Sequence, residues 1–231
     1  GGLLTDMVTG NVSQLKSRIG SILGIRKDPY DTFDEILEWL DEQKKQATFF
    51  VWVGDYGPQD KGLNWKNPHI RNLVRRLAKN HQIGLHPSYR AFDEPNRLQK
   101  EKERLESIAG ISITHSRFHF LRFKIPASYN QLIESGFEWD HSLGYSNAFG
   151  FRAATSRSFR FYDLNKEAST SLKIQPFSLM DSTAFYELKL DQHEWIAKTI
   201  HFRQMLKVLN GHLNVVMHND VSFFRYKPDF I

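Results

Sequence analysis

The chain has 231 residues, of which 40% are apolar, a formal net charge of +5 and no cysteine. This length and apolar content are enough for one large α/β domain or two small ones. The absence of cysteine excludes disulfides, thiolate metal ligands and a cysteine nucleophile, and Lys and Arg residues spread over helical faces argue against nucleic-acid binding.

The first 30 residues have apolar positions at roughly helical spacing, which predicts an amphipathic N-terminal helical extension. They lack the basic end and apolar centre of a signal peptide, so a cytoplasmic location is the expectation, although the lack of cysteine fits either side of a membrane. No run reaches the roughly 20 apolar residues that a membrane span needs.

Helices and short apolar runs then alternate along the chain. The first helix is predicted within residues 31–46, where Thr32 and Glu35 have the spacing of a capping box. Later helices are expected near 70–77, over 96–109 with Gly110 as its C-terminal cap, near 129–135, and from Asp191 to about 210. The expected strands are ATFFVWV (47–53), QIGLH (82–86), SITHSRFHF (112–120), FEWDHS (137–142), LKIQPFSLMD (172–181) and LNVVMH (213–218).

This alternation predicts a parallel sheet or barrel with helices outside. No linker, low-complexity tract or repeat divides the sequence, so residues 1–231 are predicted to form one domain with 1–30 as its extension. Functional groups in such folds lie at the carboxyl ends of the strands. The strand ends here contain His86, Arg117, His119, Asp140, Asp181, His218 and Asp220.

The segment HSRFH, residues 115–119, is the most informative of these. If it is a strand, alternation places His115, Arg117 and His119 on one face and Phe118 with Phe120 on the other. A buried arginine requires a carboxylate partner or a wet cleft. An internal ion pair, for example with Asp140, explains Arg117 as well as a functional site does.

Other reaction classes find less support. His193 and Glu194 lack the second histidine of a metalloprotease helix, and neither a phosphate-binding loop nor a nucleophile elbow is present. A glycosidase needs two carboxylates, which Asp140 and Asp181 could supply.

The motifs ATFF, IGLHPSY, SRFHFLRF, DHSLGY, GFRAAT, PFSLMD and VVMHND together resemble those of the NodB-like polysaccharide deacetylases, in a divergent branch associated with bacterial surface polysaccharides. This family consists of carbohydrate esterases with a distorted (β/α) barrel. The resemblance implies that ATFF is the second barrel strand and that His86 is the first metal histidine. It also implies that Arg117 orients the catalytic carboxylate and that His218 is the general acid.

The sequence departs from the family pattern at two places. Arg90 occupies the position of the second metal histidine, for which His119 could substitute from the neighbouring strand. Residues 1–30 do not supply the family's first strand with its pair of Asp residues. Either the chain is shortened upstream of Gly1, or another Asp has taken over.

The resemblance therefore implies a metal-dependent hydrolase that removes N-acetyl groups from a sugar or polysaccharide. Zinc is the expected metal because the proposed ligands, His86 and His119, are imidazoles. The remaining assignments are His218, Arg117 and Asp140 to catalysis and Tyr89, Arg152 and Asp220 to substrate binding. A non-catalytic carbohydrate-binding or scaffold protein and, less favoured, a glycosidase are the alternatives.

Overall fold

The computed structural model describes residues 31–219, apart from the side chain of Pro95. The described residues belong to two compact units, one of residues 45–217 and a smaller one that includes 31–44 and 218–219. The predicted helical extension of residues 1–30 lies outside the described part. That the whole chain is one domain stays a prediction.

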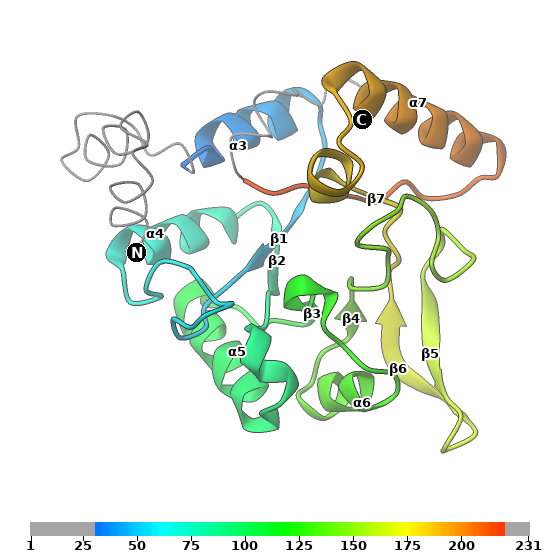
Figure 1. Ribbon diagram of the computed structural model, residues 1–231. Coiled ribbons are helices and arrows are strands. Elements are labelled where there is room, and N and C mark those ends of the chain that lie inside the picture. The colour runs from blue at the N-terminus through cyan, green and yellow to red at the C-terminus, as the bar shows by residue number, and fades with distance from the viewer. Residues whose placement is uncertain (1–30, 220–231) are drawn as a thin grey trace. The chain divides into compact units, whose positions relative to one another are not determined.

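The larger unit is built on a mostly parallel six-stranded sheet (Figure 1). Its strand order is β1-β2-β3-β4-β6-β5, and only β5 runs antiparallel to its neighbour. The strands are β1 (Thr48–Val51), β2 (Gln82–Leu85), β3 (His115–Ser116), β4 (Trp139–Asp140), β5 (Phe159–Asp163) and β6 (Ala168–Ile174). A second, parallel pair consists of β7 (Leu179–Met180) and β8 (Val215–Val216). The predicted parallel sheet is therefore confirmed.

Helices connect the parallel strands, as the sequence pattern predicted. The larger unit contains α4 (Pro68–Leu77), α5 (Pro95–Ala109), α6 (Ala127–Glu134) and α7 (Gln192–Val208). Helix α5 packs against α4 and β2, and α6 packs against β6 (Figure 1). Helix α3 (Phe33–Glu42) belongs to the smaller unit. No helix among residues 31–219 is long and apolar enough to cross a membrane.

Local sequence signals explain most helix ends. Asp191 and Glu194 form the predicted capping box of α7, and Gly110 ends α5 with a φ of +74°, which glycine adopts without a steric penalty. The capping box predicted at Thr32 and Glu35 is wrong. The Thr32 hydroxyl makes no capping bond and donates instead to the backbone carbonyl of Asn219, 3.3 Å away.

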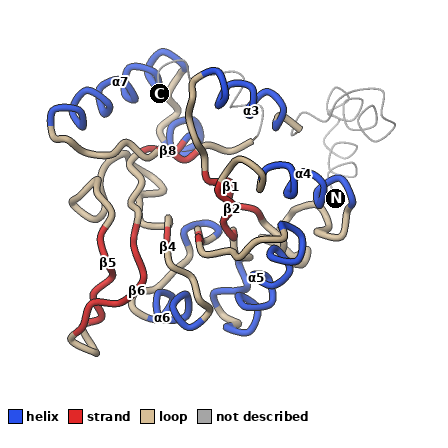
Figure 2. The backbone as a smooth tube through the Cα atoms, turned by 180° about the vertical axis from the view of Figure 1, so that it is seen from behind, coloured by secondary structure: helices blue, strands red, loops and turns tan. Residues whose placement is uncertain are grey.

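The region after β4 differs most from the prediction. Residues 159–174 form the antiparallel β5–β6 hairpin, which Figure 2 shows as two long neighbouring strands and which the sequence pattern did not indicate. The predicted strand LKIQPFSLMD is divided between β6 in one sheet and β7 in the other. Pro176 lies between them and has no N–H to continue a ladder, which accounts for the break.

The core of the larger unit fixes the strand ends that matter for function. Ile83 and Leu85 of β2 and Leu98 and Leu105 of α5 are completely buried. Strand β2 lies in parallel register between β1 and β3, with Leu85 opposite both Val51 and Ser116. The residues that follow β1, β2 and β3 therefore leave the sheet at the same edge.

Candidate active site

Two predicted metal ligands meet at this edge. His86 follows β2 and His119 follows β3, and their ring centres are 4.9 Å apart in an edge-to-face arrangement. The Nδ1 atom of His86 lies 2.5 Å from the backbone oxygen of Arg117, so this ring is held against the neighbouring strand.

His119 is held by a carboxylate that the sequence did not identify. Its Nδ1 atom is 3.1 Å from Oδ1 of Asp60, whose side chain is 2% exposed. The same carboxylate oxygen accepts a hydrogen bond from the backbone N–H of Tyr89 at 2.8 Å. Asp60 lies in the loop of residues 52–66 that follows β1, and in the sequence it is one polar residue among several without a motif.

These contacts determine the chemistry of both imidazoles. Since Nδ1 faces a carbonyl oxygen in His86 and a carboxylate oxygen in His119, Nδ1 bears the proton in each ring. In the neutral form of each ring, the lone pair is then on Nε2. A ring N–H donated to a carboxylate or a backbone carbonyl is the usual support of a metal-bound histidine.

Arg117 lies between two buried carboxylates. It is 7% exposed, and both Asp140 and Asp181 attract its charge. Burial lowers the pKa of Arg117 to about 10, so the side chain remains a cation at neutral pH. Its Nη2 atom is 3.3 Å from Sδ of Met180, and its buried Nε has no hydrogen-bond partner among the described residues.

Asp140 connects β4 to the segment that contains Arg117. Its carboxylate accepts bonds from the backbone N–H and the hydroxyl of Ser142, at 3.0 and 2.6 Å, and the Ser142 hydroxyl accepts a bond from the N–H of Phe118. Burial raises the pKa of Asp140 to about 6, against the lowering effects of Ser142 and Arg117. This network fixes the backbone beside Arg117.

The prediction that one strand face presents His115, Arg117 and His119 together is wrong. The ladder ends at Ser116, and a 3₁₀ turn, η2 (His119–Leu121), begins at His119, so strand alternation stops before that residue. His115 pairs instead with His141 (Nδ1 to Nε2, 2.9 Å), and burial lowers the pKa of His141 to about 3. The predicted partners Phe118 and Phe120 also separate, at 2% and 65% exposure.

Comparison with known proteins supports the fold. No family model and no curated protein matches the sequence. A candidate polysaccharide deacetylase from Mycobacterium smegmatis is 17% identical with a TM-score of 0.60, over 91% of this chain and 68% of that one. The chain has the polysaccharide deacetylase fold. The allantoinase PuuE is 11% identical with a TM-score of 0.53, over 89% of this chain and 62% of that one.

The predicted distorted barrel of the deacetylase type is thus confirmed as a fold, while the hydrogen-bonded strands of residues 31–219 form two sheets. Whether the deacetylase barrel lacks its first strand depends on residues 1–30, outside the described part. Within the described residues, no group of three or more His, Asp or Glu side chains has the arrangement of a metal site.

The remaining assigned residues occupy different places in the deacetylase fold. Tyr89 belongs to the turn η1 (Tyr89–Phe92), next to Phe120, with ring centres 5.9 Å apart. Arg152 donates to the backbone oxygen of Gly144 at 3.3 Å. His218 belongs to the smaller unit, so its position relative to His86 and His119 is not described. Asp220 lies outside the described residues.

Proposed function

We propose that this chain is a metal-dependent hydrolase that removes N-acetyl groups from a sugar or polysaccharide. The observation that carries the proposal is the pair His86 and His119, whose Nδ1 atoms are both engaged and whose rings are 4.9 Å apart. The polysaccharide deacetylase fold supports the reaction class. The N-acetyl amide and the sugar as substrate, and the metal as cofactor, are part of the proposal.

The donor set fits a divalent ion that accepts imidazole, of which zinc is the commonest. His86 and His119 would hold it through Nε2, with the Arg117 carbonyl and Asp60 as supports. A catalytic zinc ordinarily has three protein ligands, and residues 31–219 supply these two. When bound, the metal would polarise the acetyl carbonyl and make its water more acidic.

The protein's own groups would orient the reaction. Arg117 has a buried Nε–H without a hydrogen-bond partner among the described residues. We propose that this N–H donates to the carboxylate that takes the proton of the attacking water, and so orients it. Asp140 and Ser142 would hold Arg117 in place, while direct proton transfer by Asp140 stays a prediction. His218 would give a proton to the departing amine, so that acetate and a free amino sugar leave.

Substrate contacts are proposed for three residues. Tyr89 lies beside the histidine pair because its backbone N–H is bonded to the carboxylate that holds His119. Its ring could stack on a sugar. Arg152 and Asp220 are proposed as polar contacts to the sugar hydroxyls.

The test combines metal analysis with product analysis. We would measure zinc in the purified full chain before and after chelation, together with acetate release from chitotetraose, for the wild type and for His86→Ala and His119→Ala. His193→Ala serves as the matched control because His193 is exposed on α7. We expect near-stoichiometric zinc and acetate release in the wild type and the control, and loss of both in the other two variants.

Each outcome has a defined meaning. Full metal occupancy in His86→Ala or His119→Ala would refute the ligand assignment. A folded wild-type protein that binds a sugar without metal or turnover would instead be the non-catalytic carbohydrate-binding protein. Reducing-end release that resists chelation would favour the glycosidase, with Asp140 and Asp181 as its carboxylates.

A further inference from the structure

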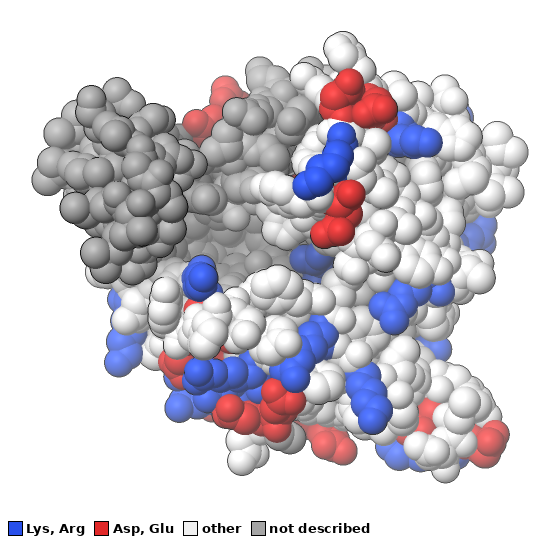
Figure 3. Space-filling model, viewed as in Figure 1, with Lys and Arg blue, Asp and Glu red and all other residues white. Residues whose placement is uncertain are grey.

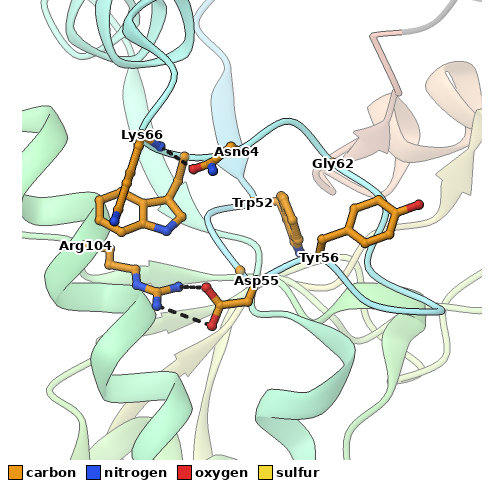
Figure 4. A pocket seen from close by; sticks show the side chains of 9 residues that line it. Trp52, Asp55, Tyr56, Gly62, Asn64, Lys66 and Arg104 are labelled. Atoms are coloured by element: carbon orange, nitrogen blue, oxygen red, sulfur yellow. Dashed lines mark hydrogen bonds and ion pairs between the residues drawn. The ribbon is translucent and has the colours of Figure 1, made fainter. Parts of the chain in front are cut away.

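A cavity lies on the loop that supplies Asp60. It has a volume of about 330 Å³, within the range of roughly 300–1,000 Å³ that small-molecule sites show. Residues 52–66 form most of its wall, and Arg104 of α5 closes it (Figure 4). The histidine pair does not line it, so this cavity is separate from the candidate active site.

Three aromatic side chains line the cavity: Trp52, Tyr56 and Trp65. Tyr56 is 67% exposed, so its ring is open to a ligand that enters the cavity. Trp52 lies against Gly62, where a Cβ atom would overlap the indole ring, so the chain approaches this ring in a way that only glycine permits. Figure 4 shows Trp52 and Tyr56 on one side of the cavity and Lys66 and Arg104 on the other.

The cationic side of the cavity is ordered. The Arg104 guanidinium lies 4.9 Å from the ring centre of Trp65 and forms an ion pair with Asp55 at 2.9 Å. Hydrogen bonding to Arg104 holds the pKa of Asp55 below its usual value, against the effect of burial. Lys66 places its ammonium 5.4 Å from the same Trp65 ring and is exposed, so its flexible stem can move toward a ligand.

The residues that line the cavity have one positive charge in excess. They include the two cations Lys66 and Arg104 and the single anion Asp55. Arg104 is paired with Asp55, so Lys66 is the cation that this ion pair leaves over. On the face seen in Figure 3, charges of both signs lie close together in the region of α4 and α5. A ligand in the cavity therefore meets aromatic rings and a local excess of positive charge.

We propose that this cavity is a binding subsite for a carboxylate-bearing sugar of an acetylated oligosaccharide. Only the acetyl group of this ligand rests on the proposed function. Trp65 and Tyr56 would contact the apolar face of the sugar ring. Lys66 would face its carboxylate. Aromatic faces beside charged donors are the combination that holds a ring with one apolar and one polar side.

The loop geometry links the cavity to the histidine pair. Residues 52–66 both line the cavity and place Asp60 against His119. Gly54 in the cavity wall lies directly against Ser88, two residues after His86, and a Cβ at Gly54 would come within 2.8 Å of the Ser88 side chain. A chain of several sugars could therefore occupy both places at once.

The test compares two probes of equal length on the full chain. Calorimetric titration with a hyaluronan tetrasaccharide, which alternates N-acetylglucosamine and glucuronate, is set against titration with neutral chitotetraose. We expect the acidic probe to bind about fivefold more tightly at low salt, the scale of one exposed ion pair. Lys66→Met should remove this preference, and Trp65→Ala should weaken both probes about tenfold.

Tyr56→Ala is the variant least expected to misfold, because this exposed side chain contributes little to the core. Its loss should still weaken the binding of both probes several-fold. Equal affinity for the two probes, no binding of either, or unchanged affinity in the three variants would overturn the subsite. His86→Ala should lose acetate release but keep the preference for the acidic probe, because this preference comes from Lys66 in the cavity. If probe binding depends on the cavity residues but the wild type releases no acetate, the proposed hydrolase function is refuted and the proposed subsite is supported.

Discussion

Replacement of Asp60 by Asn tests the support of the histidine pair most directly. The Asp60 carboxylate is almost completely buried and serves two donors, Nδ1 of His119 and the backbone N–H of Tyr89. Asn keeps a carbonyl oxygen of the same shape but removes the charge. Asp60→Ala removes the acceptor altogether.

The expected magnitudes follow from these two bonds. A hydrogen bond to a charged group contributes about 1.5–3 kcal/mol and a neutral one about 0.5–1.5 kcal/mol, so Asp60→Asn should lower the unfolding free energy by about 1–2 kcal/mol. Asp60→Ala should cost about 3–5 kcal/mol, because both bonds are lost and the Tyr89 N–H is left without its acceptor. Loss of the charge behind a metal-bound histidine typically weakens metal binding about 10–100-fold.

Urea denaturation gives the stabilities, and competition with a zinc chelator gives the metal affinities. Asp93→Asn is the control, since Asp93 is exposed and its ion pair with Arg122 lies on the surface. Wild-type zinc affinity in Asp60→Asn would refute the supporting role of Asp60. Equal stability of the Asn and Ala variants would refute the bond to Tyr89.

Three further predictions concern single positions. The pKa of Asp140 rises from an ordinary 3.8 to about 6 through burial, so the folded state holds a proton that the unfolded state has lost, and stability should fall by about 2 kcal/mol as pH rises from 4 to 7. Asp140→Asn should abolish this fall in urea titrations at several pH values, and an unchanged slope would contradict the assignment. Phe120 is 65% exposed at a φ of +54°, so Phe120→Gly should be about 0.5–1 kcal/mol more stable than Phe120→Ala, and equal thermal midpoints would argue against strain there. Gly144→Ala places a Cβ inside the buried ring of Phe177 and should cost about 1–3 kcal/mol, whereas wild-type stability would mean that this ring can move aside.

The fold was predictable where periodicity and end signals agree. Helix α5 has apolar positions at helical spacing and Gly110 at its end, and α7 opens with the Asp191–Glu194 capping box. The β5–β6 hairpin was not predicted because its outward positions are mostly exposed and no short turn signal stands between the strands. Likewise, Thr32 and Glu35 have the spacing of a capping box, but a tertiary bond to Asn219 uses the Thr32 hydroxyl instead.

The candidate site was predictable only in part. Strand ends drew attention to His86, Arg117 and His119, and the structure places Asp140 and Asp181 close enough to Arg117 to act on its charge. Asp60 was not predicted because its role depends on the path of the irregular loop of residues 52–66, which brings its carboxylate to His119. Neither residue spacing nor composition predicts such a path. The tautomers of the two histidines likewise follow from tertiary contacts, so sequence could suggest ligands but not how they are held.

The ends of two neighbouring strands supply the two histidines of the pair. Leu85 is opposite Ser116, so His86 is level with Arg117, and a continued strand would carry His119 about 7 Å beyond His86 at a rise of about 3.3 Å per residue. Phe118 is still extended, and the positive φ values at Phe120 and Leu121 come after His119, so the turn follows the histidine pair and does not create it. The two rings nevertheless lie 4.9 Å apart, and the Nδ1 atom of His119 is bonded to the buried carboxylate of Asp60. The buried carboxylate, which comes from the loop after β1, therefore holds the His119 ring beside His86.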